Sequence, residues 1–598
     1  MPRPRISLPI LREFREYSRA KLRHDLVAGA TLTLVSIPQA IGFALILGLP
    51  PATVITSVVV GGFVSALFFS SHHHVFGPTT SVSLITVATI SANPDIHLHP
   101  LQLAAYLAFL IGITQFVAGV FNFGEVTKFI SRSVVVGYTS AIGLLLMASQ
   151  LHNFAGFASP AGEPFLRTLG GAFVAFAHQN FTLWSIGIGL LTLLIFEALK
   201  RWRPAWPEAL IGLAFLGICA RVFAIYHPAI PFRMVKDEGA LSAILPTFRS
   251  LPALHEQIVL LPRLANTAIA IAIIGMLEAT AITKGLATKS GQHLNPNQEL
   301  IGMGAGNIAA GLFGVPPGSS SFTRSAVNYQ SGAASQFASM LSSVVVLLIL
   351  LFVTPIFNYI PVAALAAHLM RVGYKLINRP QIRVSMYATH SDAIVFFATL
   401  GAALLLRLDT AIYIGIGVSL ALFLMKTSTP VLAEYVFNDT GHFIEMKDKK
   451  QRVLPQISII HVEGELFFGA ADLFQEQVRA QAEDENIRVF ILRMKNARHL
   501  DASTIMAMES LDGYLRQTGR HLLISGCRPD VVRVLRNSGL LERIGEENVF
   551  PDELNPTMST KRALQRAKLL LRDKADIRIF YDRERLPADV PDSIDYSI

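Results

Sequence analysis

Hydroxyl-bearing residues gather at two places where apolar sequence is interrupted by glycine and proline. The first place reads Gly77-Pro78-Thr79-Thr80-Ser81, and the second, residues 316–325, reads Pro-Pro-Gly-Ser-Ser-Ser-Phe-Thr-Arg-Ser and includes Thr323. Each pattern predicts extended backbone followed by the start of a helix. Free N–H groups and a partial positive charge make a helix N-terminus attractive to anions. Two such ends facing one another would form an anion site that needs no metal.

Two charged residues belong to the same chemistry. Arg324 lies near the end of the second interruption and is the only charged residue between Glu299 and Arg371. A charge inside an apolar region is costly and is a functional hypothesis by default. Arg324 either lends positive potential to the anion or is structural, reaching a lipid headgroup or a helix C-terminus. Glu278, also in apolar sequence, either carries a coupling proton or is a structural carboxylate.

Composition places these residues in a membrane. The chain has 598 residues, of which 52% are hydrophobic and 16% charged, with a mean hydropathy of +0.47 and a net charge of +9. Soluble proteins carry roughly 25% charged residues. Charges are sparse in residues 25–429 and dense after them, which predicts a membrane region followed by a soluble domain. A soluble multidomain enzyme, a fibrous protein and a disordered chain are excluded, and two cysteines exclude a disulfide framework or a thiolate metal cluster.

The apolar region divides into roughly fourteen segments, some well short of the ~20 residues that a full span needs. Residues 1–24 are basic and lack an apolar core, so they predict a cytoplasmic anchor and not a cleaved signal. Lysine and arginine follow the even-numbered segments, which places both termini in the cytoplasm, with the connection 227–262 as an exception. The expected segment centres are residues 37, 60, 85, 112, 140, 190, 215, 273, 305, 328, 346, 364, 398 and 417.

The two interruptions occupy related positions. If one half begins near Asp25 and the other near Pro262, Thr79 lies 54 residues into the first half and Thr323 lies 61 residues into the second. Broken helices at matching places are typical of inverted-repeat transporters, in which irregular backbone lines a cavity near the midplane. The alternative is a pair of unrelated kinks. A third glycine-rich stretch, 302–306, mimics a dinucleotide fingerprint, but its apolar setting favours close helix packing.

Motifs in this order resemble the sulfate permease (SulP) family of anion transporters over about residues 20–560. The motifs are Asp25-Leu26-Val27-Ala28-Gly29, Ile37-Pro38-Gln39-Ala40-Ile41-Gly42-Phe43-Ala44, Gly77-Pro78-Thr79, Leu277-Glu278-Ala279, Asn297-Gln298-Glu299-Leu300-Ile301-Gly302, Asn307-Ile308-Ala309 and Ser320-Ser321-Phe322-Thr323-Arg324-Ser325-Ala326-Val327-Asn328. The resemblance implies a polytopic α-helical membrane protein with two inverted repeats of seven segments, the uracil permease-like fold. It also implies a core that moves against a gate in an elevator mechanism, a homodimer and a cytoplasmic STAS domain.

The resemblance also assigns substrate-binding residues. Gln39 and Phe43 on the first segment, Thr79 on the third, and Thr323 and Arg324 on the tenth would line the anion site, and Thr80 adds a hydroxyl beside them. Family members that couple to sodium use an acidic residue and a hydroxyl on the eighth segment. Glu278 with Thr280 or Thr283 matches that pattern only loosely, so proton coupling through Glu278 is favoured over sodium.

His72, His73 and His74 stand where a Ser-Arg or Ser-Lys pair is usual in the family, and their role stays open. A zinc site is a weak alternative, because the three are contiguous and lack a fourth ligand. Ser319 to Ser321 have no neighbouring histidine or lysine base, so nucleophilic catalysis lacks a partner and the chain is not expected to be an enzyme.

The soluble part follows an expected linker at 430–452. Strands are predicted at 457–462, 489–494 and 521–526, with a helix at about 470–483, which indicates a small α/β domain over 453–556. Its details resemble the STAS domain. Asp501 or Ser503 would cap the helix that follows, and Ser503 matches a residue that is phosphorylated in related anti-sigma-factor antagonists, so both are regulatory candidates. A C-terminal helix and tail are expected at 557–598, and the basic segment from Thr560 to Arg572 within it would pack on this domain.

The combined prediction is a secondary active transporter of a small anion, with sulfate as the first candidate, working by proton symport or anion exchange. A sodium-coupled bicarbonate or C4-dicarboxylate transporter is one alternative. An anion channel and a membrane-anchored STAS signalling protein are others. The protein is expected in the inner (plasma) membrane, within the lipid bilayer, with no cofactor, no metal and no nucleic-acid partner.

Overall fold

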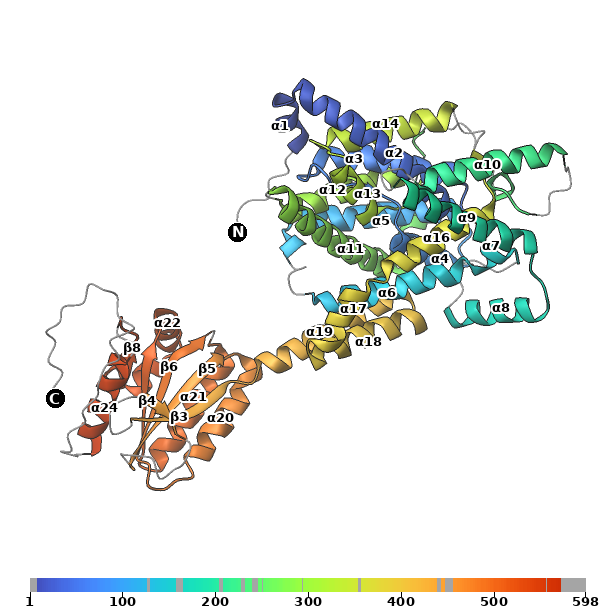
Figure 1. Ribbon diagram of the computed structural model, residues 1–598. Coiled ribbons are helices and arrows are strands. Elements are labelled where there is room, and N and C mark those ends of the chain that lie inside the picture. Colours follow the sequence, from blue (N-terminus) through green and yellow to red (C-terminus); the bar gives the residue numbers. More distant parts are fainter. Residues whose placement is uncertain are drawn as a thin grey trace. The chain divides into compact units, whose positions relative to one another are not determined.

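The computed structural model describes the chain in two compact units, residues 1–420 and 421–598, which are treated separately (Figure 1). The first seven residues and the tail after Leu571 lie outside the described residues. The described residues are 8–125, 130–157, 165–203, 208–226, 232–238, 246–249, 251–292, 294–352, 357–437, 443–446, 455–498, 500–554 and 557–571.

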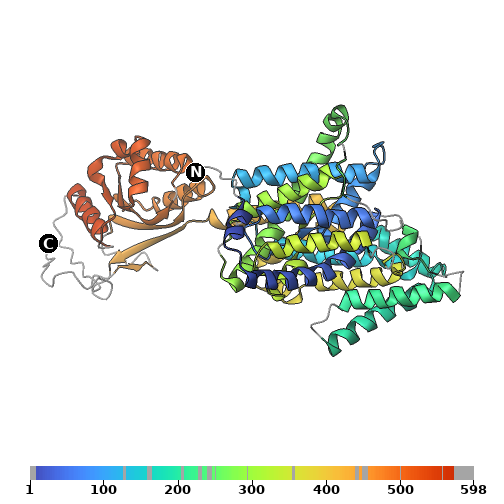
Figure 2. The same cartoon turned by 90° about the horizontal axis from the view of Figure 1, so that it is seen from above.

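The first unit is a helical bundle whose long helices run side by side (Figure 2). All fourteen expected segment centres fall inside helices. These helices are α2 (Arg19–Leu47), α3 (Pro51–Phe68), α4 (Thr80–Ser91), α5 (Pro100–Val120), α6 (Arg132–Ser149), α9 (Leu183–Trp202), α10 (Glu208–Tyr226), α11 (Leu254–Ser290), α12 (Pro296–Leu312), α13 (Phe322–Gln330), α14 (Phe337–Phe352), α16 (Val362–Leu376), α18 (His390–Leu405) and α19 (Leu408–Thr427).

Several short elements lie between or before these helices. Two strands of two residues each, β1 (Phe76–Gly77) and β2 (Ser319–Ser320), precede α4 and α13. The further helices of this unit are α1 (Pro9–Arg15), α7 (Leu151–Ala155), α8 (Phe165–Ala177), α17 (Arg379–Tyr387) and the 3-10 helix η2 (Val235–Glu238).

Not every helix is long enough to cross a membrane alone. Among the described residues, eight helices have the length and apolar composition of a span, and α4, α8, α14 and α18 are apolar but shorter. At 1.5 Å per residue, the 12 residues of α4 cover roughly half of the hydrocarbon core, so extended backbone must complete that segment. The polytopic helical fold is confirmed, and the count of fourteen spans stays a prediction.

Close helix packing surrounds α12. A Cβ added to Gly304 would come 2.5 Å from the backbone nitrogen of Phe116 on α5, so only glycine fits this contact. Apolar helices gain little from burying more apolar surface in a bilayer, and small residues let them pack by close backbone approach instead. Residues 302–306 therefore serve helix packing, as their apolar setting predicts.

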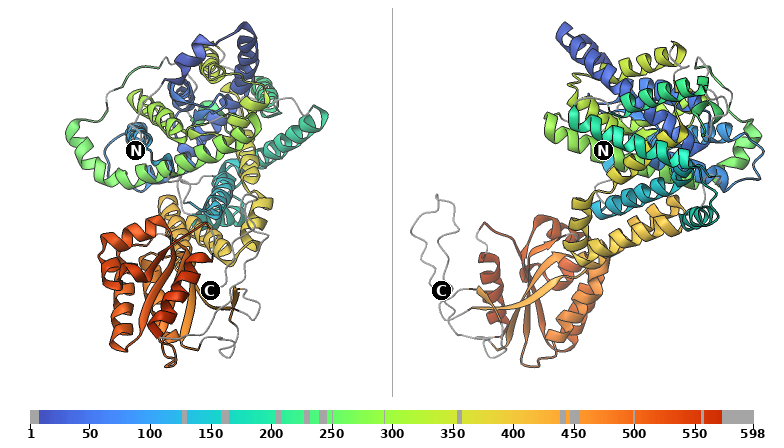
Figure 3. Two further views of the ribbon diagram at one scale, coloured as in Figure 1. Left: turned by 90° about the vertical axis from the view of Figure 1, so that its left-hand side faces the viewer. Right: turned by 45° about the vertical axis from the view of Figure 1, so that its right-hand side comes forward.

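The second unit is a six-stranded sheet with helices on both faces (Figure 3). The strand order is β4-β3-β5-β6-β7-β8, and the pairs from β5 to β8 are parallel. The strands are β3 (Val431–Phe437), β4 (Phe443–Glu445), β5 (Ile457–Glu465), β6 (Val489–Arg498), β7 (His521–Cys527) and β8 (Val549–Pro551). The helices are α20 (Phe468–Gln481), α21 (Ala502–Gln517), α22 (Pro529–Asn537), α23 (Leu540–Ile544), the 3-10 helix η4 (Glu546–Asn548) and α24 (Met558–Leu571).

Two separate apolar cores hold this sheet. One face packs Phe474 of α20 and Leu511 of α21 against β5 and β6, and the other packs Leu564 of α24 against Ile459 and Ile491. The three predicted strands and the helix near 470–483 are confirmed, as is the packing of the C-terminal helix on the domain.

The expected linker at 430–452 is wrong for most of its described residues, which are 430–437 and 443–446. Its residues 431–437 and 443–445 form β3 and β4, and β3 pairs antiparallel with β5, for example Leu432 with Val462. The reason is that the edge of β5 would otherwise expose unpaired backbone N–H and C=O groups, which a strand supplied by the preceding chain satisfies. The sheet therefore begins upstream of residue 453.

Candidate functional site

The two interruptions of apolar sequence meet. β1 and β2 pair antiparallel, with Phe76 opposite Ser320 and Gly77 opposite Ser319. α4 begins three residues after the pair on one side and α13 begins two residues after it on the other. The prediction of extended backbone followed by a helix start is confirmed at both places. Two helix N-termini from opposite halves of the unit thus begin beside one short strand pair.

Glu278 on α11 bridges the two interruptions. Its Oε1 accepts a hydrogen bond from Ser81 Oγ at 2.6 Å, and its Oε2 accepts one from Ser319 Oγ at 2.8 Å. Thr79 Oγ1 lies 3.1 Å from Ser81 Oγ and extends the cluster. One carboxylate therefore accepts hydrogen bonds from a hydroxyl of each interruption. The place where β1 pairs with β2, together with Glu278, is called the crossing below.

Arg324 extends from the second interruption onto the first. The residue is 1% exposed, and its Nη2 donates a hydrogen bond of 2.6 Å to the carbonyl of Pro78. A Cβ on Gly77, whose φ is +151°, would come 2.5 Å from Nη1, so the guanidinium lies directly against that glycine. Among the described residues, no carboxylate pairs with Arg324, and its Nε has no hydrogen-bond partner. The side chain is buried and does not extend to a lipid headgroup.

The other predicted binding residues are divided between buried and exposed positions. Gln39 and Phe43 are buried on α2, one and five residues after Pro38, and α2 packs against both α4 and α13. Thr79 precedes the first turn of α4, and Thr80 is its first residue; both are buried. Thr323 is exposed, unlike its neighbour Arg324. The structure brings Thr79, Arg324 and Glu278 together and leaves Thr323 exposed on α13.

A pair of amides supports the second interruption. Asn307 on α12 accepts a hydrogen bond from the Gly318 N–H at 2.9 Å and donates one to the Gly318 carbonyl at 3.0 Å. Its Nδ2 also donates to Gln115 Oε1 on α5 at 2.9 Å, and Ser57 Oγ donates to the Pro316 carbonyl at 2.7 Å. Sequence reasoning did not identify Gln115, although a lone amide in an apolar stretch was a usable signal.

Tyr138 is a second residue that sequence reasoning missed. Its side chain is buried on α6, which packs against α4, and its hydroxyl has no hydrogen-bond partner among the described residues. Buried hydroxyls are normally satisfied, so an unpaired one near a predicted site is a notable donor. No pattern around Tyr138 distinguishes it from an ordinary packing tyrosine.

The three consecutive histidines point to different partners. His72 Nε2 lies 3.4 Å from Glu13 Oε2 on α1, and the His73 ring meets Tyr329 edge-on with centroids 5.1 Å apart. His74 is buried between Glu299 and Ser320. In the part of the chain that the structure describes, no group of three histidine, cysteine, aspartate or glutamate residues could hold a metal.

The regulatory candidates of the second unit lie at the start of α21. Asp501 caps the helix, because its Oδ1 accepts from the Thr504 N–H at 3.0 Å, and its Oδ2 accepts from the Phe468 N–H at 2.7 Å. Ser503 is the second residue of the helix, half-buried, and does not cap. The capping prediction is confirmed for Asp501.

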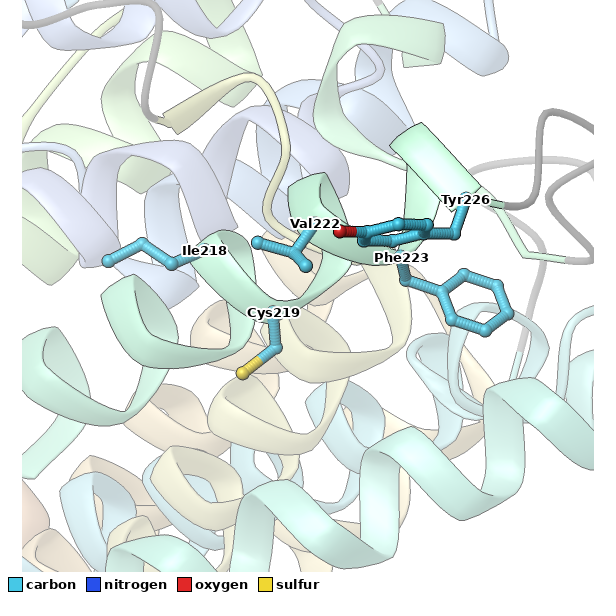
Figure 4. A pocket seen from close by; sticks show the side chains of 5 residues that line it. All are labelled: Ile218, Cys219, Val222, Phe223 and Tyr226. Carbon is cyan, nitrogen blue, oxygen red and sulfur yellow. The ribbon is translucent and has the colours of Figure 1, made fainter.

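A hollow of about 480 Å³ lies along α10 and is not part of this site. Its lining is mainly apolar, and Figure 4 shows the Cys219 thiol and the Tyr226 hydroxyl as its polar side-chain groups. None of the lining residues belongs to the interruptions. The hollow offers an anion no positive charge. Its lining residues are Ile218, Cys219, Val222, Phe223 and Tyr226.

Fold and site together define a class of protein. An apolar helical unit with two paired, interrupted segments, a buried arginine at their crossing and an attached α/β domain is a polytopic membrane transporter of the anion-carrying kind. The chain belongs to the sulfate permease family, whose model matches residues 22–399, and the STAS domain model matches residues 448–555. The protein is therefore a transporter and not an enzyme, and the family resemblance read from the motifs is confirmed.

Two sulfate transporters of other organisms are similar to nearly the whole chain. Sulfate transporter 4.1, chloroplastic, of Arabidopsis thaliana is 28% identical over 568 residues, which cover 91% of this chain and 81% of that protein. A putative sulfate transporter of Bacillus subtilis (strain 168), YvdB, is 27% identical over 544 residues, which cover 90% of this chain and 97% of that protein.

Solved structures share the fold. The murine Solute Carrier 26 family member A9 anion transporter in the inward-facing state matches with a TM-score of 0.82 at 19% identity, covering 94% of each chain. The transmembrane domain of a cyanobacterium bicarbonate transporter, BicA, matches with a TM-score of 0.58 at 23% identity, covering 66% of this chain and 98% of that one. At these identities the likeness concerns the fold alone.

Proposed function

We propose that the protein is a secondary active transporter of a small anion, with sulfate as the first candidate, and that the anion binds between the N-termini of α4 and α13. The observation that carries the proposal is the buried guanidinium of Arg324 at the crossing of β1 and β2, without a carboxylate partner among the described residues. An unpaired buried cation is costly, and an anion bound beside it would offset that cost. The sulfate transporters among the relatives support the choice of substrate.

The donors for such an anion come from several elements. The first N–H groups of α4 and α13 have no partner within their helices, and both helix dipoles place partial positive charge at the crossing. Thr79 and Thr80 add hydroxyls at the start of α4, and Gln39 and Phe43 would close the site from α2. Thr323, exposed on α13, would contact the anion only from the open side of the site.

Glu278 supports coupling to protons. When ionised, it takes the Ser81 and Ser319 hydroxyls as donors and places a negative charge where the anion would come. A proton on Glu278 removes that repulsion, so anion and proton would bind together. Under this scheme the same site runs symport with a proton gradient and exchange without one.

The remaining parts of the proposal concern the whole protein. It works as a homodimer in the inner (plasma) membrane with both termini in the cytoplasm, and its core moves against its gate in an elevator motion. The STAS domain regulates the transport rate through the start of α21, where Asp501 and Ser503 lie.

A panel of uptake measurements tests the proposal. The purified full-length protein is reconstituted into liposomes, and uptake of labelled sulfate, bicarbonate, fumarate and chloride is measured with and without pH and sodium gradients, against protein-free liposomes. Sulfate accumulation driven by an inward proton gradient is expected. Sodium-driven uptake of bicarbonate or fumarate, or chloride flux that no gradient can concentrate, would contradict it.

A further inference from the structure

His74 is buried in the first unit, and both of its ring nitrogens make hydrogen bonds. It lies in the connection between α3 and β1, where Nδ1 is 2.5 Å from Glu299 Oε2 and Nε2 is 2.6 Å from Ser320 Oγ. The ring stacks on Phe69, with centroids 4.1 Å apart. Both ring nitrogens are hydrogen-bonded and the ring plane is fixed, so the position of His74 is set more firmly than packing alone requires.

Glu299, the partner of His74 Nδ1, is itself held in place by several hydrogen bonds. Glu299 lies in the first turn of α12 and is buried, and its Oε1 accepts from the N–H groups of Ser70 and Ser71 at 2.8 and 2.9 Å. The Ser70 hydroxyl adds a third bond at 2.5 Å. A buried carboxylate with this many donors is satisfied as an anion, which makes His74 Nδ1 the donor to Oε2.

The partner on the other side belongs to the crossing point. Ser320 forms β2 with Ser319 and lies opposite Phe76 in the strand pair. Ser319 donates to Glu278, and Arg324 follows four residues after Ser320. A displacement of Ser320 would therefore move the hydroxyl that Glu278 holds and the start of α13 together.

We propose that His74 is a positioning residue for anion binding, which transmits the fixed position of Glu299 to the second interruption through Ser320. The proposal rests on the proposed function, in which the crossing binds the anion. His74 does not touch the anion and transfers no proton. Its two nitrogens hold β2 in register, so that the Ser319 hydroxyl and the Arg324 guanidinium stay where the first interruption meets them.

Adjacent histidines supply a matched control. His73 is also buried, but its ring makes an edge-on aromatic contact, and its Nδ1 has no hydrogen-bond partner within the described part of the chain. His73→Phe and His74→Phe both preserve an aromatic ring, and only His74→Phe removes the two hydrogen bonds that link Glu299 to Ser320. The full-length protein in detergent is used for sulfate affinity and thermal unfolding, and proteoliposomes are used for kcat and KM.

We expect His74→Phe to raise the Kd and KM for sulfate by about tenfold, the scale of one to two lost hydrogen bonds, with a smaller change in kcat. Ser320→Ala should raise the Kd and KM for sulfate by a similar factor. The double variant should bind sulfate no more weakly than either single variant, because both substitutions remove the same link. His73→Phe should stay within about twofold of wild type.

Two conservative variants separate positioning from packing. The amide of His74→Asn can occupy the place of Nδ1 and contact Glu299, and the amide of His74→Gln can occupy the place of Nε2 and contact Ser320. Neither amide spans both partners, so His74→Gln, which keeps the contact to Ser320, should recover sulfate affinity only in part, and His74→Asn should not recover it. If His74→Phe does not fold, Ser320→Ala and His74→Gln carry the same comparison.

Additive effects in the double variant, rescue by His74→Asn alone, or loss of thermal stability without loss of affinity would each overturn the inference. An unchanged affinity in Ser320→Ala would overturn it as well. Wild-type protein that binds no anion of the uptake panel would overturn the proposed function and this inference together. Normal binding by wild type with unaffected variants would overturn this inference alone.

Discussion

Arg324 shows how one residue can decide the charge of a site. Its guanidinium is buried against Gly77 and Pro78 and has a carbonyl, not a carboxylate, as its partner. A structural arginine at such depth would normally be paired with an acid. No acid among the described residues pairs with the guanidinium directly, so its positive charge can attract a mobile anion, most strongly when Glu278 is protonated.

Replacement of this charge is the first prediction. Arg324→Ala should weaken sulfate binding by about 1–3 kcal/mol, the value of a hydrogen bond to a charged group, while expression and thermal stability stay near wild type. Titration calorimetry measures the affinity. Arg263→Ala, which breaks an exposed pair with Asp95, is the control and should have no effect on binding. Loss of folding together with binding would show that Arg324 is structural.

The second prediction concerns Glu278, which shares the crossing. Glu278→Gln keeps the contacts to Ser81 and Ser319 in shape but cannot take up a proton, so proton-driven accumulation should be lost while sulfate exchange continues. Paired uptake and counterflow assays measure the two activities. Glu256→Gln is the control, because Glu256 lies on α11, 22 residues before Glu278, and accepts a hydrogen bond from the Ala253 N–H. This variant should retain proton-driven accumulation and sulfate exchange. Accumulation at the wild-type level in Glu278→Gln would remove this residue from coupling.

At the scale of elements, the second interruption depends on α12. Gly318 has both of its backbone polar groups bonded to one side chain, that of Asn307, and both residues are buried in the helical bundle. An irregular segment at membrane depth persists only if its backbone is satisfied by protein. The Asn307 side chain thus satisfies the backbone N–H and carbonyl beside β2, as a neighbouring strand would in a larger sheet.

The third prediction follows from this contact. Asn307→Ala should lower the free energy of unfolding by about 2–4 kcal/mol, because it leaves a buried N–H and a buried carbonyl unpaired. Thermal unfolding in detergent measures the change. Asn297→Ala, at the exposed start of the same helix, should cost less, since water can replace its bonds. Equal losses in the two variants would contradict the role given to Asn307.

In the second unit, α21 carries the predicted phosphorylation site, Ser503. Ser503 lies beside the Asp501 cap, so a phosphate there would meet both the attraction of the helix dipole and the repulsion of the carboxylate. As the fourth prediction, Ser503→Glu should change the transport rate by a factor of about two to five without changing the order of anions in the uptake panel. Ser510→Glu, an exposed position later on α21, is the control. An altered anion preference would count against a purely regulatory STAS domain.

At the scale of the whole molecule, the proposed roles of the two units differ: the first unit binds the anion and the STAS domain regulates the rate. Every residue proposed to bind the anion, from Gln39 to Arg324, lies in the first unit. The STAS sheet begins with β3 at Val431, directly after α19, so a cut within β3 or β4 would leave an unpaired edge.

The fifth prediction uses this boundary. A chain ending at Thr427, the last residue of α19, should keep the same ranking of sulfate, bicarbonate, fumarate and chloride while its rate or abundance changes. Uptake normalised to reconstituted protein measures both quantities. A changed ranking would show that the STAS domain takes part in selecting the anion.

Local chemistry let the sequence by itself determine much of this protein. The apolar runs predicted the fourteen helices that contain the expected segment centres, but not α7, α8 or α17, and glycine and proline marked the interruptions at Gly77 and Pro316. Two isolated charges in apolar sequence, Arg324 and Glu278, identified the crossing. Family motifs added the transporter class and the STAS domain. Each of these features depends on neighbouring residues along the chain, which is why the pattern was readable.

Only the tertiary structure decided which of these parts touch. The pairing of β1 with β2, the bridge from Glu278 to Ser81 and Ser319, and the bonds of His74 to Glu299 and Ser320 join residues about 40 to 250 positions apart. It also buried Arg324 while exposing Thr323, and it turned an expected linker into β3 and β4. Such contacts depend on how whole helices and strands pack, and packing among distant segments leaves no periodic mark in the sequence.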